Sequence, residues 1–247
     1  MPDVLGYRAK FGVLVPSTNT VVEPDFYAMA PPGVTLHTGR ISITNPRMED
    51  DAGMEALMVQ IRASIGQAVR DVMTCEPDYL VMGMSSETFW GGRKGTEEFE
   101  RNIERLSGLR IATGARACER ALTVLGARRL GIVTPYQPVG DAQVRRFLEE
   151  CGYEVVALKG LRCPTAVSIA HEDEATLRRA ILEVNRPEVE AIVQVGTNLS
   201  MLRLADEAER WLGKPVIAIN AATFWYALRE NGITGQVRGF GRLLAEH

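Results

Sequence analysis

Short runs of apolar, often β-branched residues alternate along the chain with longer segments in which apolar residues recur three and four positions apart. The short runs predict strands buried on both faces, and the longer segments predict amphipathic helices. We expect strands at Phe11–Val15, Thr35–Ile43, Tyr79–Met82, Arg110–Thr113, Leu130–Thr134, Glu154–Leu158, Ala191–Val195 and Pro215–Ile219. We expect helices near residues 53–74, 96–107, 115–125, 139–151, 172–185, 199–212 and 221–230. This alternation predicts an α/β fold with parallel sheets.

The two halves of the chain repeat the same pattern. Each half contains a strand that begins with glycine and ends in proline, at Gly12–Pro16 and at Gly131–Pro135. Two further pairs of strands follow in the same order in both halves, and such a repeat indicates duplicated structural units. We therefore predict two pseudo-symmetric, doubly wound α/β lobes, residues 1–118 and 119–247, with part of the C-terminal helix packing on the first lobe.

Small polar residues follow the carboxyl ends of several expected strands, where parallel-sheet proteins bind their ligands. Hydroxyl, amide and backbone N–H groups at helix N-termini can hold an anion, so this pattern indicates a site for a small carboxylate between the lobes. Serine, threonine and asparagine also cap helices in the absence of any ligand, so each position alone has a purely structural explanation. The residues concerned are Ser17–Thr20, Ser85, Ser86, Pro135, Tyr136, Gly196–Asn198 and Asn220.

Composition narrows the class of protein. The formal net charge is −3, with 46% hydrophobic and 24% charged residues, which is typical of a folded domain and gives no reason to expect a nucleic-acid partner. The longest uncharged stretch, Pro215–Leu228, is too short for a membrane span. The N-terminal residues Met1–Arg8 carry no recognisable secretory signal, so we expect a cytoplasmic protein.

Metal binding is not expected, because the four cysteines show no C-x-x-C spacing and only three histidines are present. A homo-oligomer is expected instead from the helix near residues 53–74. This helix carries an apolar row of Leu57, Ile61 and Ile65, which would be covered by a second copy of the chain.

Several residue groups resemble motifs of the aspartate/glutamate racemase superfamily, in its maleate cis-trans isomerase and arylmalonate decarboxylase branch. The groups are Pro16–Thr20 with Glu23, Thr134-Pro-Tyr136, Gly196–Leu199 and Asn220–Trp225. The resemblance extends from about Lys10 to Arg229. It implies two lobes that clamp a small carboxylic acid, with one cysteine from each lobe serving in proton transfer or covalent chemistry, and no cofactor.

Both cysteines of that pattern are missing here. The resemblance places the first at Met84, beside Gly83, and the second at Gly196. Isomerising a double bond through a thiolate adduct needs a sulfur at one of these positions. A cofactor-independent lyase of the arylmalonate decarboxylase type is therefore favoured. The alternatives are a maleate isomerase-like enzyme with a relocated base and a non-catalytic carboxylate-binding protein.

The substrate-binding part of the pattern is better preserved. The resemblance implies that Ser85, Ser86, Tyr136 and Thr197 hold the substrate carboxylate and the charge of an enediolate intermediate, and that Asn19 also contacts the substrate. Preorganised donors of this kind can each contribute roughly 3–4 kcal/mol to transition-state stabilisation. The neighbouring positions expected in the same substrate-binding site are Thr18, Met84, Gly196 and Asn198.

Three residues are candidates for proton transfer in place of the thiols. Glu87 directly follows the serine pair, although an acidic residue is also favoured at a helix start without any function. Tyr136 could supply a phenolic proton or only donate a hydrogen bond. Cys163 lies in the loop that corresponds to Ile43–Pro46 of the first lobe, and its alternative is a buried structural cysteine.

Overall fold

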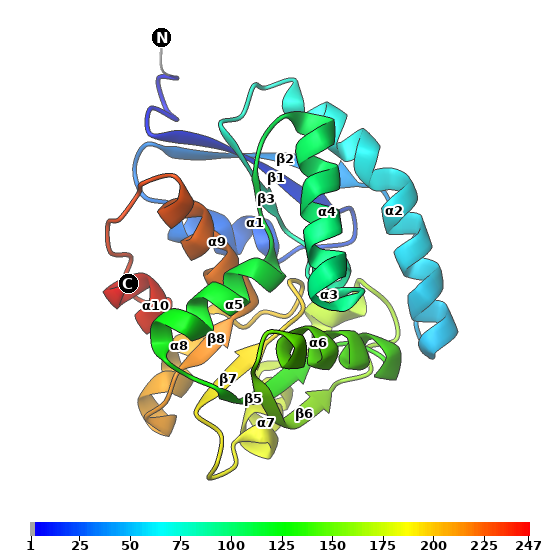
Figure 1. Ribbon diagram of the computed structural model, residues 1–247, viewed down its shortest axis with the longest axis vertical. Helices are drawn as coiled ribbons and strands as arrows, with labels where there is room; N and C mark the ends of the chain where they lie inside the picture. The colour runs from blue at the N-terminus through cyan, green and yellow to red at the C-terminus, as the bar shows by residue number, and fades with distance from the viewer. Residues whose placement is uncertain (1–2) are drawn as a thin grey trace.

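The computed structural model describes residues 3–247 and contains two four-stranded parallel sheets with helices around them (Figure 1). The first sheet consists of β1 (Ala9–Pro16), β2 (Val34–Ile41), β3 (Tyr79–Met82) and β4 (Ile111–Ala112). The second consists of β5 (Arg129–Thr134), β6 (Glu154–Gly160), β7 (Ala191–Gln194) and β8 (Val216–Ala218). The orders β2-β1-β3-β4 and β6-β5-β7-β8 are the same in both sheets, which confirms the predicted α/β class and its internal repeat.

The helices connect the strands and cover the sheets. The first half contains α1 (Val22–Met29), α2 (Asp51–Met73), α3 (Ser86–Phe89), α4 (Gly92–Ser107) and α5 (Gly114–Leu125). The second half contains α6 (Pro138–Glu150), the 3₁₀ turn η1 (Ser168–His171), α7 (Glu174–Val184), α8 (Leu202–Leu212), α9 (Ile219–Glu230) and α10 (Arg242–Glu246). Helices α2, α5 and α7 begin with a side-chain cap; at α2 the Asp50 carboxylate accepts a hydrogen bond from the Gly53 N–H.

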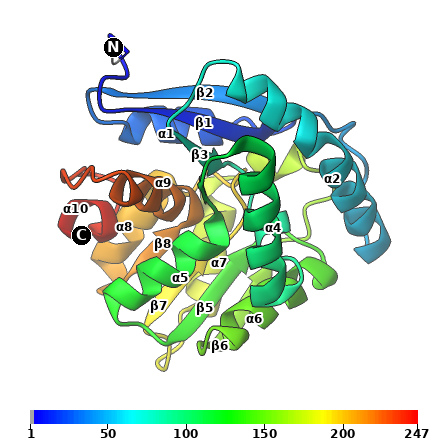
Figure 2. The ribbon, with the colours of Figure 1, turned by 45° about the horizontal axis from the view of Figure 1, so that its top comes forward.

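Helix α9 joins the two sheets. It follows β8 in the chain, yet it also contacts α1, α5 and β3, and Figure 2 shows it lying between α1 and β8. Its Phe224 ring packs 5.1 Å from Phe26 of α1 and 6.2 Å from Phe11 of β1, between ring centroids. The hydrophobic core therefore continues from one sheet to the other, and the first turn of α9 is placed where the two halves meet.

Some boundaries differ from the prediction. Helix α1 was not expected, because it has only eight residues and Pro24 near its start, which leaves a weak helical pattern. The Asn19 side chain caps this helix, since its Oδ1 accepts hydrogen bonds from Val21 N and Val22 N at 2.9 and 3.0 Å. The expected strand ending at Ile219 was too long, because Ile219 already belongs to α9.

The apolar row on α2 does not form an exposed face. Leu57, Ile61 and Ile65 are only 6%, 2% and 6% exposed, because they pack inside the chain itself. The prediction that a second copy of the chain covers this row was therefore wrong. Self-association itself stays a prediction.

Among residues 3–247, no helix combines the length and apolar character needed to cross a membrane. Within the same range, no cluster of three or more His, Cys, Asp or Glu side chains is placed to hold a metal ion. The N-terminal segment Met1–Arg8 includes residues 1 and 2, which lie outside the described residues.

Candidate active site

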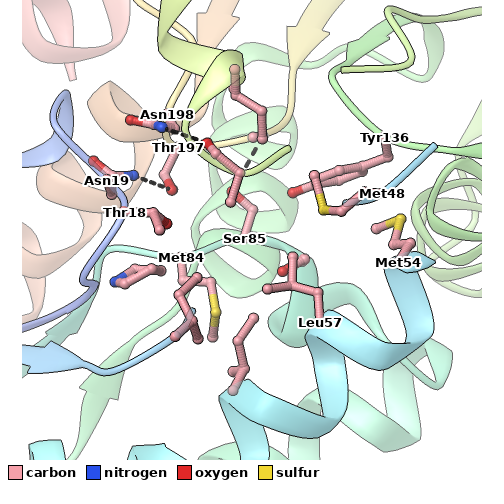
Figure 3. Close-up of a pocket in the computed structure, with 17 residues that line it drawn as sticks. Thr18, Asn19, Met48, Met54, Leu57, Met84, Ser85, Tyr136, Thr197 and Asn198 are labelled. Carbon is pink, nitrogen blue, oxygen red and sulfur yellow. Dashed lines mark hydrogen bonds between the residues drawn. The ribbon is translucent and has the colours of Figure 1, made fainter. Parts of the chain in front are cut away.

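A pocket lies where the carboxyl ends of strands from both sheets meet (Figure 3). It contains residues that follow β1, β3, β5 and β7. The predicted site residues that line it are Thr18, Asn19, Met84, Ser85, Ser86, Tyr136, Gly196, Thr197 and Asn198. Met84 and Gly196, which belong to different halves of the chain, therefore face the same space.

Hydrogen bonds join the two halves at this pocket. Asn19 Nδ2 donates to Thr197 Oγ1 at 3.2 Å, and the Thr197 hydroxyl donates to the Gly83 carbonyl at 3.0 Å. The Thr20 N–H donates to Asn198 Oδ1 at 3.0 Å. These bonds hold the loops after β1, β3 and β7 in one arrangement.

The same bonds decide which groups can still donate to a ligand. The hydroxyl hydrogen of Thr197 points to a main-chain carbonyl, so this hydroxyl is not a free donor for a ligand. Ser85 Oγ accepts a hydrogen bond from the Gly196 N–H at 3.3 Å, so its own hydroxyl hydrogen can go to the Tyr136 phenol or to a ligand. Asn19 Nδ2 uses one hydrogen on Thr197 and has a second one.

Tyr136 is the only ionisable side chain that lines the pocket, counted over the residues that the structure describes. Burial raises the pKa of its phenol well above the ordinary value, and the nearby Ser85 side chain partly opposes this shift. The phenol is therefore protonated at neutral pH and can donate a hydrogen bond.

The remaining lining is apolar and was not predicted from the sequence. These residues are Pro16, Ile43, Met48, Met54, Leu57, Ile61, Ala166 and Ile169. Met48 is brought in by pairing between two distant loops, because its N–H donates to the Pro164 carbonyl at 2.7 Å and Arg47 forms an antiparallel bridge with Thr165. The regular spacing of apolar residues in α2 indicates that Leu57 and Ile61 lie on one buried face. The sequence alone assigned that face to the outside of the chain.

Glu87 and Cys163 lie outside this lining. Glu87 Oε1 accepts a hydrogen bond from Arg62 Nε at 2.7 Å, and burial raises the pKa of this carboxyl against the influence of that arginine. Cys163 is 1% exposed, with its Sγ 3.4 Å from Glu172 Oε1, and burial raises the pKa of the thiol to about 12. Both side chains are thus held by other partners.

The backbone at Gly196 requires glycine. Its φ of 111° is one that residues with side chains rarely adopt, and an added Cβ would lie 2.5 Å from Pro135 Cδ. No thiol can be placed there without moving the loop.

Comparisons with known proteins point to one family. A sequence model of the family described as arylmalonate decarboxylase matches residues 11–244. Over 244 residues the chain is 26% identical to a maleate isomerase from Pseudomonas putida, covering 96% of this chain and 97% of that relative. Over 165 residues it is 28% identical to an arylmalonate decarboxylase from Bordetella bronchiseptica, covering 66% of this chain and 69% of that relative.

A solved structure supports the same fold. The maleate cis-trans isomerase of Nocardia farcinica, in a mutant form with a covalently bound succinylcysteine intermediate, matches with a TM-score of 0.85 at 23% identity. The match covers 96% of this chain and 98% of that one.

Proposed function

Because the chain belongs to the arylmalonate decarboxylase family, whose relatives named above are enzymes, we propose that it is a cofactor-independent lyase. Its substrate in this proposal is a malonate that carries an apolar substituent, and its products are carbon dioxide and a monocarboxylic acid. The observation that carries the proposal is the composition of the pocket, where neutral hydrogen-bond donors and apolar side chains line the same space.

Decarboxylation needs only groups of this kind. The bond between the α-carbon and one carboxylate breaks, carbon dioxide leaves, and the electron pair moves into the retained carboxylate as an enediolate. A proton from water then adds to the α-carbon. The step that needs help is the growth of negative charge on the retained carboxylate, and fixed donors stabilise such charge without a base or a nucleophile.

In this proposal the retained carboxylate faces Ser85, Ser86 and Tyr136, with Asn19 at its edge. Ser85 and Tyr136 are neighbouring hydroxyls, and the Tyr136 phenol stays protonated, so this pair can donate to the carboxylate. The leaving carboxylate faces Met48 and the other apolar residues. A carboxylate loses hydration against such a wall, which favours its conversion to neutral carbon dioxide.

Isomerisation is less well supported. Rotation about a double bond by covalent addition requires a nucleophile at the substrate carbon. The pocket lining, taken over residues 3–247, contains no thiol, carboxylate, imidazole or amine. Glu87 and Cys163 would each have to leave their present partners to reach it.

The test is a substrate screen followed by proton NMR. Phenylmalonate and alkylmalonates are expected to give the corresponding monocarboxylic acids, and maleate is expected to give no fumarate. Fumarate from maleate would instead identify an isomerase. Saturable binding of these acids without turnover of any of them would identify a carboxylate-binding protein.

A further inference from the structure

One arginine fixes the loop that carries Asn19. Arg40, near the end of β2, donates from Nη1 to the carbonyl oxygens of Asn19 and Pro16 at 2.9 and 3.3 Å. Its Nη2 forms an ion pair with Glu23 in the first turn of α1. A single guanidinium therefore holds both ends of the β1–α1 loop and ties them to the following helix.

The second half of the chain repeats this arrangement around Tyr136. Arg162, just beyond the end of β6, donates from Nη1 to the Tyr136 carbonyl and to Asp141 Oδ2. Asp141 lies in the first turn of α6, and its Oδ1 accepts a hydrogen bond from the Thr134 hydroxyl. Thr134 Oγ1 in turn accepts from the Tyr136 N–H at 3.2 Å. Both main-chain polar groups of Tyr136 are thus held by one network, in which Asp141 is buried and the Arg162 side chain is 43% exposed.

Three features separate this network from an ordinary surface ion pair. The Asp141 side chain is only 9% exposed, and a buried carboxylate is stable only where partners satisfy it. Arg162 adopts a left-handed φ of 60°, which is unfavourable for a residue with a side chain and persists only where the surroundings demand it. The same arrangement of arginine, loop carbonyl and carboxylate occurs at Arg40 in the other half.

We propose that Arg162 and Asp141 are positioning residues for Tyr136, as Arg40 is for Asn19. The network fixes the main chain of Tyr136, so that its phenol reaches the bound carboxylate at the distance needed for hydrogen bonding. This inference rests on the proposed function, in which Tyr136 donates to the substrate.

The first test measures the position of Tyr136 without using activity. The protein is labelled with [¹³Cζ]-tyrosine, and the signal lost in Tyr136→Phe identifies Tyr136 among the six tyrosines. Arg162→Met is expected to shift or broaden that signal, and Arg162→Lys is expected to restore part of the wild-type shift. Arg40→Met changes the same kind of network in the other half and is expected to leave the Tyr136 signal in place.

The second test is a double-mutant cycle on turnover of phenylmalonate. Arg162→Met is expected to lower kcat about 10-fold or more while KM changes little, since a small misplacement of a catalytic group has effects of this size. In the Tyr136→Phe background the same substitution is expected to change kcat less than about 2-fold, because the group that it positions is already absent. Arg146→Met, which removes an exposed pair with Glu150 on α6, is the control for loss of an arginine.

The outcomes separate the two proposals. No turnover by the wild type, together with a displaced Tyr136 signal in Arg162→Met, would refute the lyase and support the positioning role. A Tyr136 NMR signal that does not move in Arg162→Met would overturn the positioning role, whether or not the wild type turns over phenylmalonate. So would kcat losses of the two single variants that multiply in the double variant. If Arg162→Met does not fold, the same comparisons are made with Asp141→Asn, which removes the charge and keeps an oxygen acceptor.

Discussion

The backbone N–H of Gly196 donates a hydrogen bond to Oγ of Ser85 over 3.3 Å, although the two residues are 111 positions apart in the chain. This contact joins the loop after β7 to the loop after β3, so a donor from one half of the chain is oriented by the backbone of the other. Because Ser85 accepts here, its hydroxyl hydrogen can go to the Tyr136 phenol or to a ligand. The donors of the pocket therefore exist in their working arrangement only when both halves are together.

Replacing Tyr136 with phenylalanine is expected to lower kcat for a substituted malonate by ~10²-fold or more, because one donor to the developing oxyanion is lost. Steady-state kinetics on the purified variant measure this. The control is Tyr27→Phe, which alters a tyrosine that is 60% exposed and outside the pocket. Equal rates for wild type and Tyr136→Phe would show that the carboxylate binds elsewhere.

Removing the Cys163 thiol is expected to leave turnover unchanged within about 2-fold. The thiol is buried, does not line the pocket, and has a pKa raised to about 12, so it is not a thiolate at neutral pH. Cys163→Ser and treatment of the wild type with iodoacetamide check this prediction by kinetics. Near-total loss of activity in a folded Cys163→Ser protein would mean that a thiol takes part.

Gly196→Ala is expected to destabilise the protein more than Gly126→Ala. Both glycines have positive φ, but an added Cβ meets Pro135 Cδ at 2.5 Å in the first case and nothing within 4 Å in the second. We expect a loss of about 1–2 kcal/mol from the backbone at Gly126, and about 3 kcal/mol or more at Gly196. Thermal unfolding compares the two, at roughly 2–4 °C per kcal/mol. Equal decreases in Tm for the two variants would mean that the loop after β7 can move to accept the added Cβ at no cost.

Asp25 is expected to make stability depend on pH. Burial raises the pKa of this carboxyl from 3.8 to about 6, and the hydrogen bond from Asn220 and the charge of Arg203 oppose the shift. The folded state thus holds the Asp25 proton more tightly than the unfolded state. Protonated Asp25 therefore stabilises the fold below about pH 4, and this contribution is lost as the pH rises through 6.

Asp25→Asn removes that dependence and still offers an oxygen to Asn220 Nδ2, which donates to Asp25 Oδ2 at 2.8 Å in the wild type. Relative to this variant, the wild type should lose on the order of 2 kcal/mol of unfolding free energy between pH 4 and pH 6. Urea denaturation of both proteins at the two pH values measures the difference. If the unfolding free energies of the wild type and the variant change equally between the two pH values, the pKa of Asp25 lies near its ordinary value.

Much of the fold could be predicted because each strand is a short apolar run bounded by glycine, proline or small polar residues. Gly12–Pro16 and Gly131–Pro135 mark equivalent central strands, and the repeat predicts equal sheet orders. Helix α1 could not be predicted, because it depends on the Asn19 side chain turning back to cap Val21 and Val22. That bond follows from the conformation of a turn and leaves no periodic signal.

The polar half of the pocket could be predicted because the carboxyl ends of parallel strands converge at one edge of each sheet. The apolar half could not. Met48 reaches the pocket only because its loop pairs with Pro164 and Thr165, which are far away in the sequence. The arginine networks were also missed, since Arg40 and Arg162 act on main-chain carbonyls and nothing in their sequence neighbourhood marks such a contact.

The measurement that tests the lyase most directly is proton NMR of phenylmalonate incubated with the protein in D₂O. The lyase predicts phenylacetate that carries deuterium from the solvent at its α-carbon, with formation slowed in Tyr136→Phe. An unchanged phenylmalonate spectrum after prolonged incubation, together with conversion of maleate to fumarate by the same preparation, would contradict it.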